Sequence, residues 1–473
     1  MLQSDGLVNA QAGPIRTAWV SPALICFLLG LVGAISMIVL TPPFQVPDEQ
    51  EHFHRAYQLS ELQLRGTMVG GRAGGVLPSS LIELSEAFLG TRAIHAERQI
   101  TAQPLRDTWL AFGRPLDPDR REFVDFTSTA FYSPMGYLPQ AIAIAGGRWA
   151  RAGPLALLYL ARLTNALVAV ALLSWSVRLM PIGREAVMVA GLLPMAVFEY
   201  ASAAPDAAVI STAFLFTTVA LRAQLRGDWT ADEIAIAAVS GLVFCSQKPV
   251  YAPLLLLGLP SALTGKRRKR ILLANSVILV VGLGATAFWI HFALSKDIAP
   301  LPGMSIADQR AYITAHPLGY FKVIAHSIWH HRIFYFKSLI GVLGWLTIYL
   351  PKIVYVSAAS ALLLSILTEP ADVPRLPTLA VVWNIFLLIA SVLLIMTSIY
   401  LIFEYVASST VEGVQGRYFI PLLPLFIATA CSVITARPFR KTSRMGLSVP
   451  VPMAIAANLL IADVTMVLAY EVL

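Results

Sequence analysis

The chain has 473 residues, 57% of them hydrophobic and only 13% charged, with a mean hydropathy of +0.70. Soluble domains carry roughly 25% charged residues, so this composition excludes an ordinary soluble protein and predicts many membrane segments. The formal net charge is +8, and the basic residues are concentrated in short loops between apolar runs. Such loops are typical of the cytoplasmic side of a membrane protein, so they do not indicate nucleic-acid binding.

The predicted architecture is an all-α, polytopic bundle of about 11–13 transmembrane segments, because a helix needs about 20 residues to cross a bilayer. In chain order, the candidate segments are 18–40, 155–177, 185–203, 206–222, 232–247, 250–264, 271–294, 351–368, 377–402, 417–436 and 449–471. Two shorter stretches rich in Gly or Pro, 134–150 and 337–350, are expected to be re-entrant or interfacial.

The chain then divides into four parts, which are a cytoplasmic N-terminus (1–17), a transmembrane domain (18–436), a basic cytoplasmic loop (437–448) and a final transmembrane helix (449–473). Basic residues in short loops indicate which ends face the cytoplasm. These loops contain Arg178 and Arg184, Arg222 and Arg226, Lys266 to Arg270, and Arg437 to Arg444. We therefore expect a bacterial cytoplasmic-membrane protein whose external segments are 41–129, 295–337 and 404–415.

The first external loop opens with a dense cluster of ionisable groups just outside the first helix. Three carboxylates and two imidazoles lie within seven residues, at Asp48, Glu49, Glu51, His52 and His54. Ionisable groups at a membrane boundary are costly to desolvate and typically mark functional sites. A carboxylate here is placed to act as a general base on a substrate whose lipid part stays in the bilayer. The alternative is structural, since acids after a proline also suit the first turn of a helix.

Spacing within this cluster suggests further roles. Asp48 and His52 are four residues apart, as are Glu51 and Arg55, so each pair shares a helix face. Asp48, Glu49 and His52 are therefore candidate ligands for a divalent cation such as Mg²⁺ or Mn²⁺, with Glu51, His52 and Arg55 as candidate substrate-binding residues. A His-x-His pattern directs its rings apart, unlike an i, i+4 zinc pair, so solvated side chains or ion pairs are the alternative.

Two amphipathic helices are expected within the same loop. Residues 50–64 have a partial helical stripe of apolar side chains, and 78–89 have an apolar run that Ser79 or Ser80 could cap. Both stretches are expected to lie flat at the membrane interface with their apolar faces down.

Two later charged residues sit at the ends of apolar segments. Asp206 either caps the helix that follows it or serves as a second acid beside Asp48. Lys248, in the sequence Gln247-Lys248-Pro249, interrupts a very apolar stretch. It is either a lysine that extends its ammonium group to the interface or a ligand for phosphate.

A glycine-flanked group precedes one of the last segments. Gln415 lies between Gly413 and Gly416, and Arg417 and Tyr418 follow at the start of the helix. Flexible backbone beside a guanidinium suits an anionic oxygen cluster such as a phosphate. The alternative is an interfacial Arg-Tyr anchor. The three cysteines, Cys26, Cys245 and Cys431, lie in apolar runs and are expected to be buried and free.

Taken together, the blocks PPFQVPDEQEHFHRAYQLS, AAPDA, SQKPVYAP and GVQGRYFIPLLP resemble those of the DUF2142 family of bacterial membrane proteins. That family is grouped with the GT-C glycosyltransferases, multi-spanning enzymes that use polyprenyl-phosphate-linked sugars. The resemblance implies a GT-C-like fold with Asp48-Glu49 as the acidic pair of the first external loop, Asp206 as a second acid and Arg417 as a ligand for the donor phosphate. FYSPMGYLP (residues 131–139) corresponds to a Pro-containing aromatic block of such enzymes, whereas their HPPLGK-type and WWDYG-type blocks are absent.

The function predicted from these residues is transfer of a sugar from a polyprenyl-phosphate carrier to an extracytoplasmic glycan or lipid. Asp48 would act as base, Glu49 would share that role or hold the cation, and Lys248 would assist Arg417. Membrane lipid is an expected partner and nucleic acid is not. The rival hypotheses are a transporter or flippase of a lipid-linked saccharide and a non-catalytic factor in cell-envelope assembly.

Overall fold

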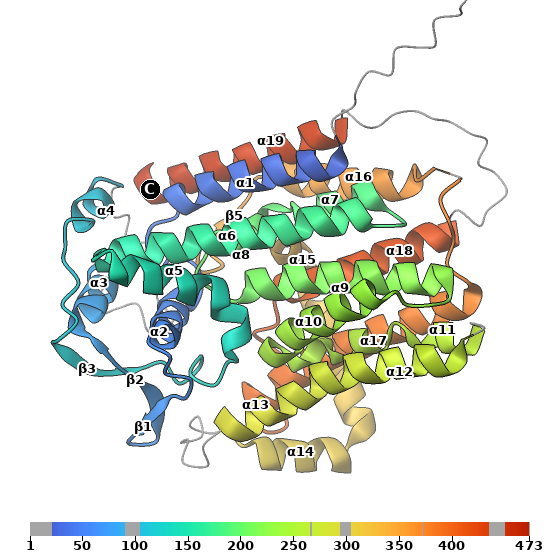
Figure 1. Ribbon diagram of the computed structural model, residues 1–473, viewed down its shortest axis with the longest axis horizontal. Helices are drawn as coiled ribbons and strands as arrows, with labels where there is room; N and C mark the ends of the chain where they lie inside the picture. Colours follow the sequence, from blue (N-terminus) through green and yellow to red (C-terminus); the bar gives the residue numbers. More distant parts are fainter. Residues whose placement is uncertain are drawn as a thin grey trace, which may run out of the picture.

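The computed structural model of the chain describes residues 21–89, 105–264, 267–293, 304–370, 372–434 and 450–472 (Figure 1). The predicted N-terminal segment (1–17) and the predicted basic loop (437–448) lie outside these residues. Helices dominate the described chain, and most run along the long axis of the molecule. The structure confirms the predicted all-α, polytopic bundle.

Seven helices among the described residues are long and apolar enough to cross a membrane. They are α1 (Pro22–Leu40), α6 (Pro154–Leu179), α9 (Asp206–Arg226), α12 (Arg268–Leu279) continued by η3 (Val280–Gly284) and α13 (Ala285–Ala293), α17 (Thr378–Ile402), η4 (Gly416–Leu422) with α18 (Leu423–Ile434), and α19 (Pro450–Val467) with η5 (Leu468–Val472). Each coincides with a predicted segment.

The four other predicted segments are also helical but are broken or shorter. They are α7 (Arg184–Gly191) with α8 (Pro194–Tyr200), α10 (Ala231–Gln247), η2 (Pro249–Leu256) with α11 (Leu259–Thr264), and α16 (Lys352–Leu367). Prolines account for two of the breaks, because Pro194 and Pro249 lack the N–H that would continue the preceding helix. All eleven predicted segments are therefore helical within the described residues.

The two stretches expected not to cross are short elements at one end of the bundle. Residues 134–150 form η1 (Pro134–Tyr137) and α5 (Leu138–Trp149), which packs against the start of α6. Residues 337–350 include the end of α15 (Pro317–Ile340) and the hairpin of β4 (Val342–Leu343) and β5 (Ile348–Tyr349). Before α15, the helix α14 (Ile306–Ala315) packs on α17.

The first external loop folds into a small subdomain of mixed structure. Its helices are α2 (Glu49–Ser60), α3 (Ser79–Leu89) and α4 (Leu105–Ala111), and the first two confirm the predicted ones. The expectation that α2 lies flat at the interface is wrong, because α2 is buried over nine of its twelve residues. Ser79 and Ser80 bond outside α3, to Arg120 and Asp117, rather than capping it.

Sequence analysis did not predict the three-stranded antiparallel sheet of this subdomain. It consists of β1 (Thr67–Val69), β2 (Arg72–Pro78) and β3 (Arg121–Asp125). Gly70 and Gly71 both have positive φ and join β1 to β2 in a two-residue turn, the geometry that matches the twist of paired strands. The sheet and α3 enclose their own apolar core against α5 and α6.

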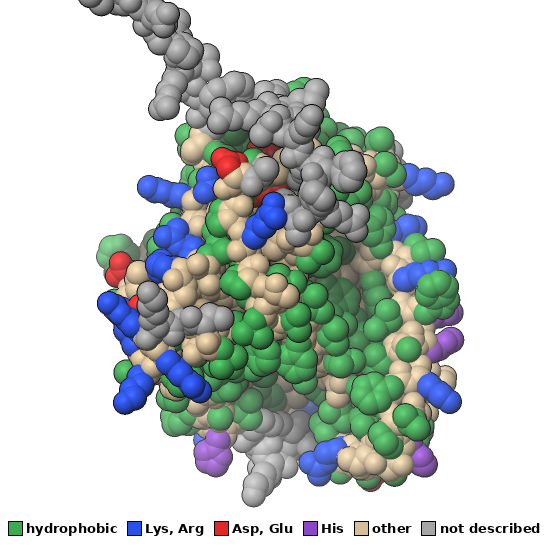
Figure 2. All heavy atoms as spheres, turned by 90° about the vertical axis from the view of Figure 1, so that its right-hand side faces the viewer, with side chains coloured by type: hydrophobic (Ala, Val, Ile, Leu, Met, Phe, Trp, Pro, Cys, Tyr) green, Lys and Arg blue, Asp and Glu red, His purple; other side chains and the backbone are tan. Residues whose placement is uncertain are grey.

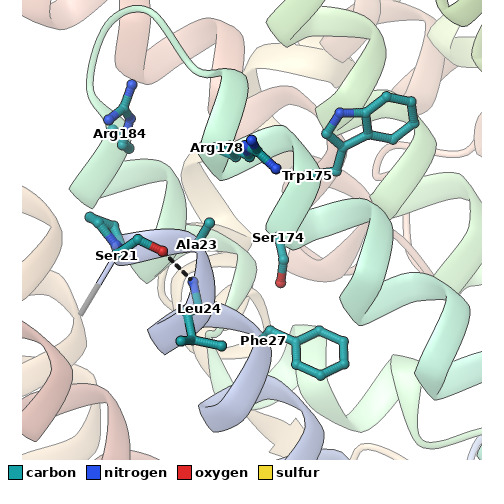
Figure 3. A pocket seen from close by; sticks show the side chains of 9 residues that line it. Ser21, Ala23, Leu24, Phe27, Ser174, Trp175, Arg178 and Arg184 are labelled. Atoms are coloured by element: carbon teal, nitrogen blue, oxygen red, sulfur yellow. Dashed lines mark hydrogen bonds between the residues drawn. The ribbon is translucent and has the colours of Figure 1, made fainter.

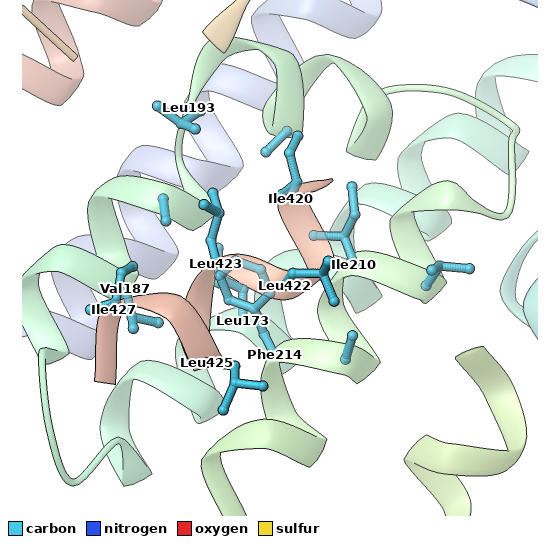
Figure 4. Close-up of a cluster of buried hydrophobic side chains, with 14 of the residues drawn as sticks. Leu173, Val187, Leu193, Ile210, Phe214, Ile420, Leu422, Leu423, Leu425 and Ile427 are labelled. Atoms are coloured by element: carbon cyan, nitrogen blue, oxygen red, sulfur yellow. The ribbon is translucent and has the colours of Figure 1, made fainter. Parts of the chain in front are cut away.

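The main core lies between the long helices, where apolar side chains of α6, α7, α9 and α18 interdigitate (Figure 4). Small residues allow close helix contacts, as is usual in membrane bundles. A Cβ on Gly191, for example, would lie 2.3 Å from a methyl carbon of Leu173. All three cysteines are buried, as predicted, and none of them forms a disulfide within the described residues.

The two ends of the bundle differ in chemistry. Among the described residues, the loops predicted as cytoplasmic that join α6 to α7 and α9 to α10 lie at the right-hand end of Figure 1, where Arg222 donates to the carbonyl of Leu179 and Gly183 donates to Glu369. Figure 2 views this end and shows several Lys and Arg side chains with few acids. The subdomain of the first external loop lies at the opposite end, together with the charged groups described next. This separation agrees with the predicted orientation, which stays a prediction.

Candidate functional site

The start of the first external loop is fixed by a buried ion pair between Glu49 and Arg162 of α6. Neither side chain is exposed to solvent, and the guanidinium contacts both carboxylate oxygens, at 2.8 and 2.5 Å. The same carboxylate accepts hydrogen bonds from the backbone N–H groups of Phe44 and Ala203. Glu49 therefore joins the loop, α6 and the turn before α9 at a single point.

Asp48, its neighbour in sequence, has the opposite environment. Its side chain is exposed and makes no hydrogen bond or ion pair within the described chain. Its backbone is left-handed, with φ of 60°, a conformation that Asp tolerates better than most residues but that often marks functional positions. The fixed Glu49 therefore holds Asp48 in a defined place while leaving its carboxylate free.

The side chain of His52, one turn further along α2, faces the aromatic block 131–139. His52 Nδ1 lies 2.7 Å from the hydroxyl of Tyr137, and its ring is 6.0 Å from that of Tyr132. Burial lowers the pKa of His52 to about 4, so the ring is neutral at pH 7.

Three consecutive carbonyls hold the aromatic block in place. They are those of Phe131, Tyr132 and Ser133, which accept hydrogen bonds from Trp289, Arg55 and Gln247, respectively. The donors come from α13, α2 and α10, so three elements far apart in sequence fix one loop. A Cβ on Gly136 would lie 2.6 Å from the Gln247 side chain, which explains the glycine in this block.

Asp206 and Lys248 form a second ion pair beside this block. Their carboxylate oxygen and ammonium nitrogen are 2.5 Å apart, and both side chains retain some exposure, 15% and 18%. Asp206 is the first residue of α9, and the ammonium of Lys248 lies over the ring of Tyr418 at 5.1 Å. Lys248 is thus neutralised by an acid rather than extended to the interface.

Arg417 forms the third pair, with Glu199 at the end of α8. One guanidinium nitrogen lies 2.5 Å from one carboxylate oxygen. The Arg417 Nε and the second oxygen of Glu199 are both buried without partners in the described chain. The adjoining Gly416 packs directly against α15, where a Cβ would be 2.0 Å from the carbonyl oxygen of Tyr335. Only glycine fits there, so the backbone leading to Arg417 is rigidly seated.

These groups converge around His52. Burial has the largest effect on the pKa of His52, and the charges of Asp48, Asp206, Lys248 and Arg417 have the next largest effects. Burial likewise raises the pKa of Tyr132, on which Lys248, Asp206 and Asp48 also act. Residues of the first external loop and residues 206, 248 and 417 therefore share one region at the end of the bundle, as the sequence predicted.

The chain was also compared with known proteins. Residues 29–426 match the family described as predicted membrane protein (DUF2142). The chain belongs to this family. Comparisons with curated proteins and with solved structures gave no match. The resemblance to the DUF2142 family inferred from the sequence is thus confirmed, whereas the relation to GT-C enzymes stays a prediction.

Within this DUF2142 chain, two of the predicted site residues have structural roles. Both oxygens of Glu49 are occupied by Arg162 and backbone amides, so Glu49 has no free lone pair directed at a substrate. Arg55 is fully buried and donates to the carbonyls of Leu64 and Tyr132, so it positions the aromatic block instead of contacting substrate.

The predicted metal ligands do not form a metal site. Glu49 is saturated, and His52 Nδ1 is bonded to Tyr137. Within the tentative set, the Asp48 carboxylate and the second ring nitrogen of His52 (Nε2) have no hydrogen-bond partner in the described chain, so only two of the three side chains have a ligand atom left. More generally, no group of three or more His, Cys, Asp or Glu side chains suited to a metal ion occurs among the described residues.

The remaining predicted residues lie at the edge of the cluster. Glu51 accepts a hydrogen bond from Ser128, and burial, followed by the nearby charges of Asp48 and Asp125, raises its pKa to about 7. The side-chain oxygen of Gln415 is buried without a partner among the residues described. The ring of Tyr418 lies beneath both cations, and its carbonyl accepts from Tyr251.

Sequence reasoning missed Arg162 and Glu199, the two partners that neutralise predicted site residues. Each is a single charge inside a long apolar run, in LYLARLTNA and PMAVFEYAS. Ionisable residues at such depth are rare and normally pair with one another. The signal was therefore present, but it does not state which charges pair.

Proposed function

We propose that the chain is an integral-membrane glycosyltransferase that moves a sugar from a polyprenyl-phosphate carrier to an extracytoplasmic glycan or lipid, with Asp48 as general base. The observation that carries the proposal is the state of Asp48. It is an exposed, unpaired carboxylate on a left-handed backbone, beside a cluster in which the other acids and the two cations are paired.

A general base needs a lone pair that the folded protein has not already used. Glu49 and Glu199 are buried and bonded to arginines, and Asp206 is bonded to Lys248. Asp48 alone among these four acids has both oxygens available. Its fixed neighbour Glu49 supplies the orientation that a catalytic group requires.

The proposed step is a direct displacement. The acceptor hydroxyl oxygen forms a bond to the anomeric carbon while its proton passes to Asp48. The bond between that carbon and the phosphate oxygen breaks, and its electron pair leaves with the polyprenyl phosphate. Inversion at the anomeric carbon follows, because attack and departure occur on opposite faces of the sugar.

Arg417 is proposed to stabilise the charge that develops on the departing phosphate. Preorganised cations act in this way in other transferases. The single-contact pair with Glu199 supports this role, because Glu199 contacts only one of the guanidinium nitrogens of Arg417. Lys248 is proposed to assist Arg417, since both cations lie over the ring of Tyr418.

The predicted divalent cation has no step in this proposal. The side chains that would hold it are already committed to Arg162 and Tyr137. We place the donor phosphate against Arg417 and Lys248 instead, at the outer face of the cytoplasmic membrane, with the carrier chain in the bilayer.

The proposal is tested with the Asp48→Asn variant, which keeps the size of the side chain and removes its basicity. The matched control is Asp119→Asn, an exposed acid of the same loop with no partner among the described residues. Both variants are compared with the wild type in detergent, with radiolabelled hexose on undecaprenyl phosphate as donor and short envelope glycans as acceptors. We expect D48N to lose transfer by about 10²- to 10⁴-fold and D119N to retain it, with equal thermal stability for both.

Full transfer by D48N would refute the assignment of the base. If the wild type instead moves the lipid-linked sugar between the leaflets of proteoliposomes without transfer to any acceptor, the protein is a transporter and the enzyme proposal is wrong.

A further inference from the structure

A second charged cavity lies at the basic end of the bundle, far from Asp48 along α1. It has a volume of about 570 Å³ and is lined by residues of α1, α6 and the start of α7. The lining residues are Ser21, Pro22, Ala23, Leu24, Phe27, Ser174, Trp175, Arg178 and Arg184. Figure 3 shows Arg178 and Arg184 on one side of it and the first turn of α1 on the other.

The cavity contains positive charge that the described protein does not neutralise. Arg178 has no hydrogen-bond or ion-pair partner in the described part of the chain, and Arg184 donates only to the carbonyl of Met180, at 3.3 Å. The lining includes no Asp or Glu. Some other arginines at the same end are paired, since Arg222 and Arg226 pair with Glu233 and Arg270 pairs with Asp228.

The first turn of α1 lines the same cavity but offers few backbone donors, because the N–H groups of Leu24 and Ile25 are both bonded to Ser21. Ser21 is its N-cap and accepts from the N–H of Leu24, while Pro22 has no N–H. The N-terminus of a helix of this length carries partial positive charge and favours an anion. Two guanidinium groups and a helix N-terminus thus border one opening whose other walls are largely apolar, an arrangement suited to a phosphate diester attached to a lipid.

An apolar surface continues from the cavity along the bundle. On α1 the side chains of Leu24, Leu28, Val32 and Ile35 are all exposed and recur every three or four residues, so they form one stripe. Trp175 on α6 is also exposed beside the cavity. In a membrane such a stripe contacts acyl chains, and Trp at its end marks the headgroup level. A free phosphate would use only the charged part of this surface.

We infer that this cavity binds the headgroup of an anionic phospholipid of the leaflet that faces the basic loops, with its acyl chains along the α1 stripe. Basic pockets between transmembrane helices are the usual form of such sites. The occupant is a structural or modulatory lipid, not the donor of the proposed transfer, because the cavity and the Asp48 cluster lie at opposite ends of the bundle. The inference therefore stands whether or not the protein is a transferase.

The test compares lipid binding to the full chain purified in detergent. Wild type, R178Q/R184Q and the control R268Q/R375Q are titrated with phosphatidylglycerol, with phosphatidylcholine and with glycerol 3-phosphate, and bound lipid is counted by native mass spectrometry. Arg268 and Arg375 suit the control because both are exposed, lie at the same end outside the cavity and have no partner among the described residues. Thermal stability without added lipid verifies that each variant is folded.

We expect phosphatidylglycerol to bind the wild type and the control alike and R178Q/R184Q about 30-fold more weakly, because each arginine near an anionic headgroup contributes a factor of about five. A second variant, Ala23→Phe, fills the cavity without changing charge and is expected to weaken binding as well. Equal losses in the two double variants would overturn the inference in favour of nonspecific attraction. Equal binding of phosphatidylcholine, or saturation by glycerol 3-phosphate at the same concentration, would overturn it too.

Discussion

The buried pair between Glu49 and Arg162 gives the sharpest test of how the loop that contains Asp48 is held. Glu49→Gln keeps the shape of the side chain but removes the charge and replaces one acceptor oxygen with an NH₂ group. That group would face the Arg162 guanidinium or the Phe44 N–H, both of which are donors. Arg162 would then be a buried charge with only carbonyl partners, those of Ile38, Thr41 and Pro42.

The magnitude follows from the burial of both groups, which are 0% exposed. Removing one partner of a fully buried ion pair costs about 3–5 kcal/mol, because the remaining charge is left uncompensated. We therefore expect E49Q and Arg162→Met each to lower the free energy of unfolding by about 3–5 kcal/mol. The double variant E49L/R162M should lose less than the sum of the two single variants, since it leaves no unpaired charge.

The assay is unfolding in mixed micelles titrated with a denaturing detergent, followed by tryptophan fluorescence. Glu83→Gln is the control, because Glu83 pairs with Arg120 at an exposed site and such pairs contribute about 0–1 kcal/mol. An E49Q variant within about 1 kcal/mol of the wild type would show that Glu49 is not the anchor of this loop. The explanation of why Asp48 is held in place would then fail.

Three further predictions concern the cluster itself. Burial raises the pKa of Glu51 to about 7, so the folded state holds this proton more tightly than the unfolded state does. The free energy of unfolding should therefore fall as pH rises from about 4.5 to above 7. Glu51→Gln should abolish this part of the fall, which is checked by measuring the stability difference from the wild type as a function of pH. Arg417→Gln should reduce the rate of sugar transfer about 10²- to 10³-fold, and Arg417→Lys should recover part of this loss. An unchanged kcat in Arg417→Gln would exclude Arg417 from the transfer step. Treatment with EDTA should leave transfer unchanged, because the predicted metal ligands are engaged by Arg162 and Tyr137, and a loss restored by Mg²⁺ or Mn²⁺ would contradict this expectation.

The helical segments were predictable because their signal is local. A run of about 20 apolar residues specifies a membrane helix without reference to the rest of the chain. The same reasoning found α2 and α3, whose apolar stripes are also local. It missed the sheet of β1, β2 and β3, because these strands are three to seven residues long and lie in a Gly-rich, polar stretch. Their pairing depends on contact between segments about 50 residues apart.

The site was predictable only in part, for a related reason. Density of charge near a membrane boundary pointed to residues 48–55, 206, 248 and 417, and the structure brings most of these together. The roles within the cluster depend on partners 113 and 218 positions away, Arg162 for Glu49 and Glu199 for Arg417. Asp48 and Glu49 are adjacent acids with the same chemistry, so both were predicted to be catalytic. In the structure the Asp48 carboxylate has no partner among the described residues, whereas both oxygens of Glu49 are already bonded.

Under the proposed function, the pattern of pairing also explains how cations that bind an anionic donor are tolerated in a membrane protein. An unpaired cation at this depth would cost several kcal/mol, so Arg417 and Lys248 need carboxylates while the site is empty. The two pairs differ in geometry. The compact ammonium group of Lys248 lies 2.5 Å from Asp206, whereas the larger guanidinium of Arg417 contacts Glu199 through only one of its nitrogens. Under the proposed function, a donor phosphate binds a nitrogen of Arg417 that Glu199 does not contact, so Glu199 is not displaced. The guanidinium then links the buried Glu199 to the transient anion, whereas Asp48 needs no cation as a partner because it faces water.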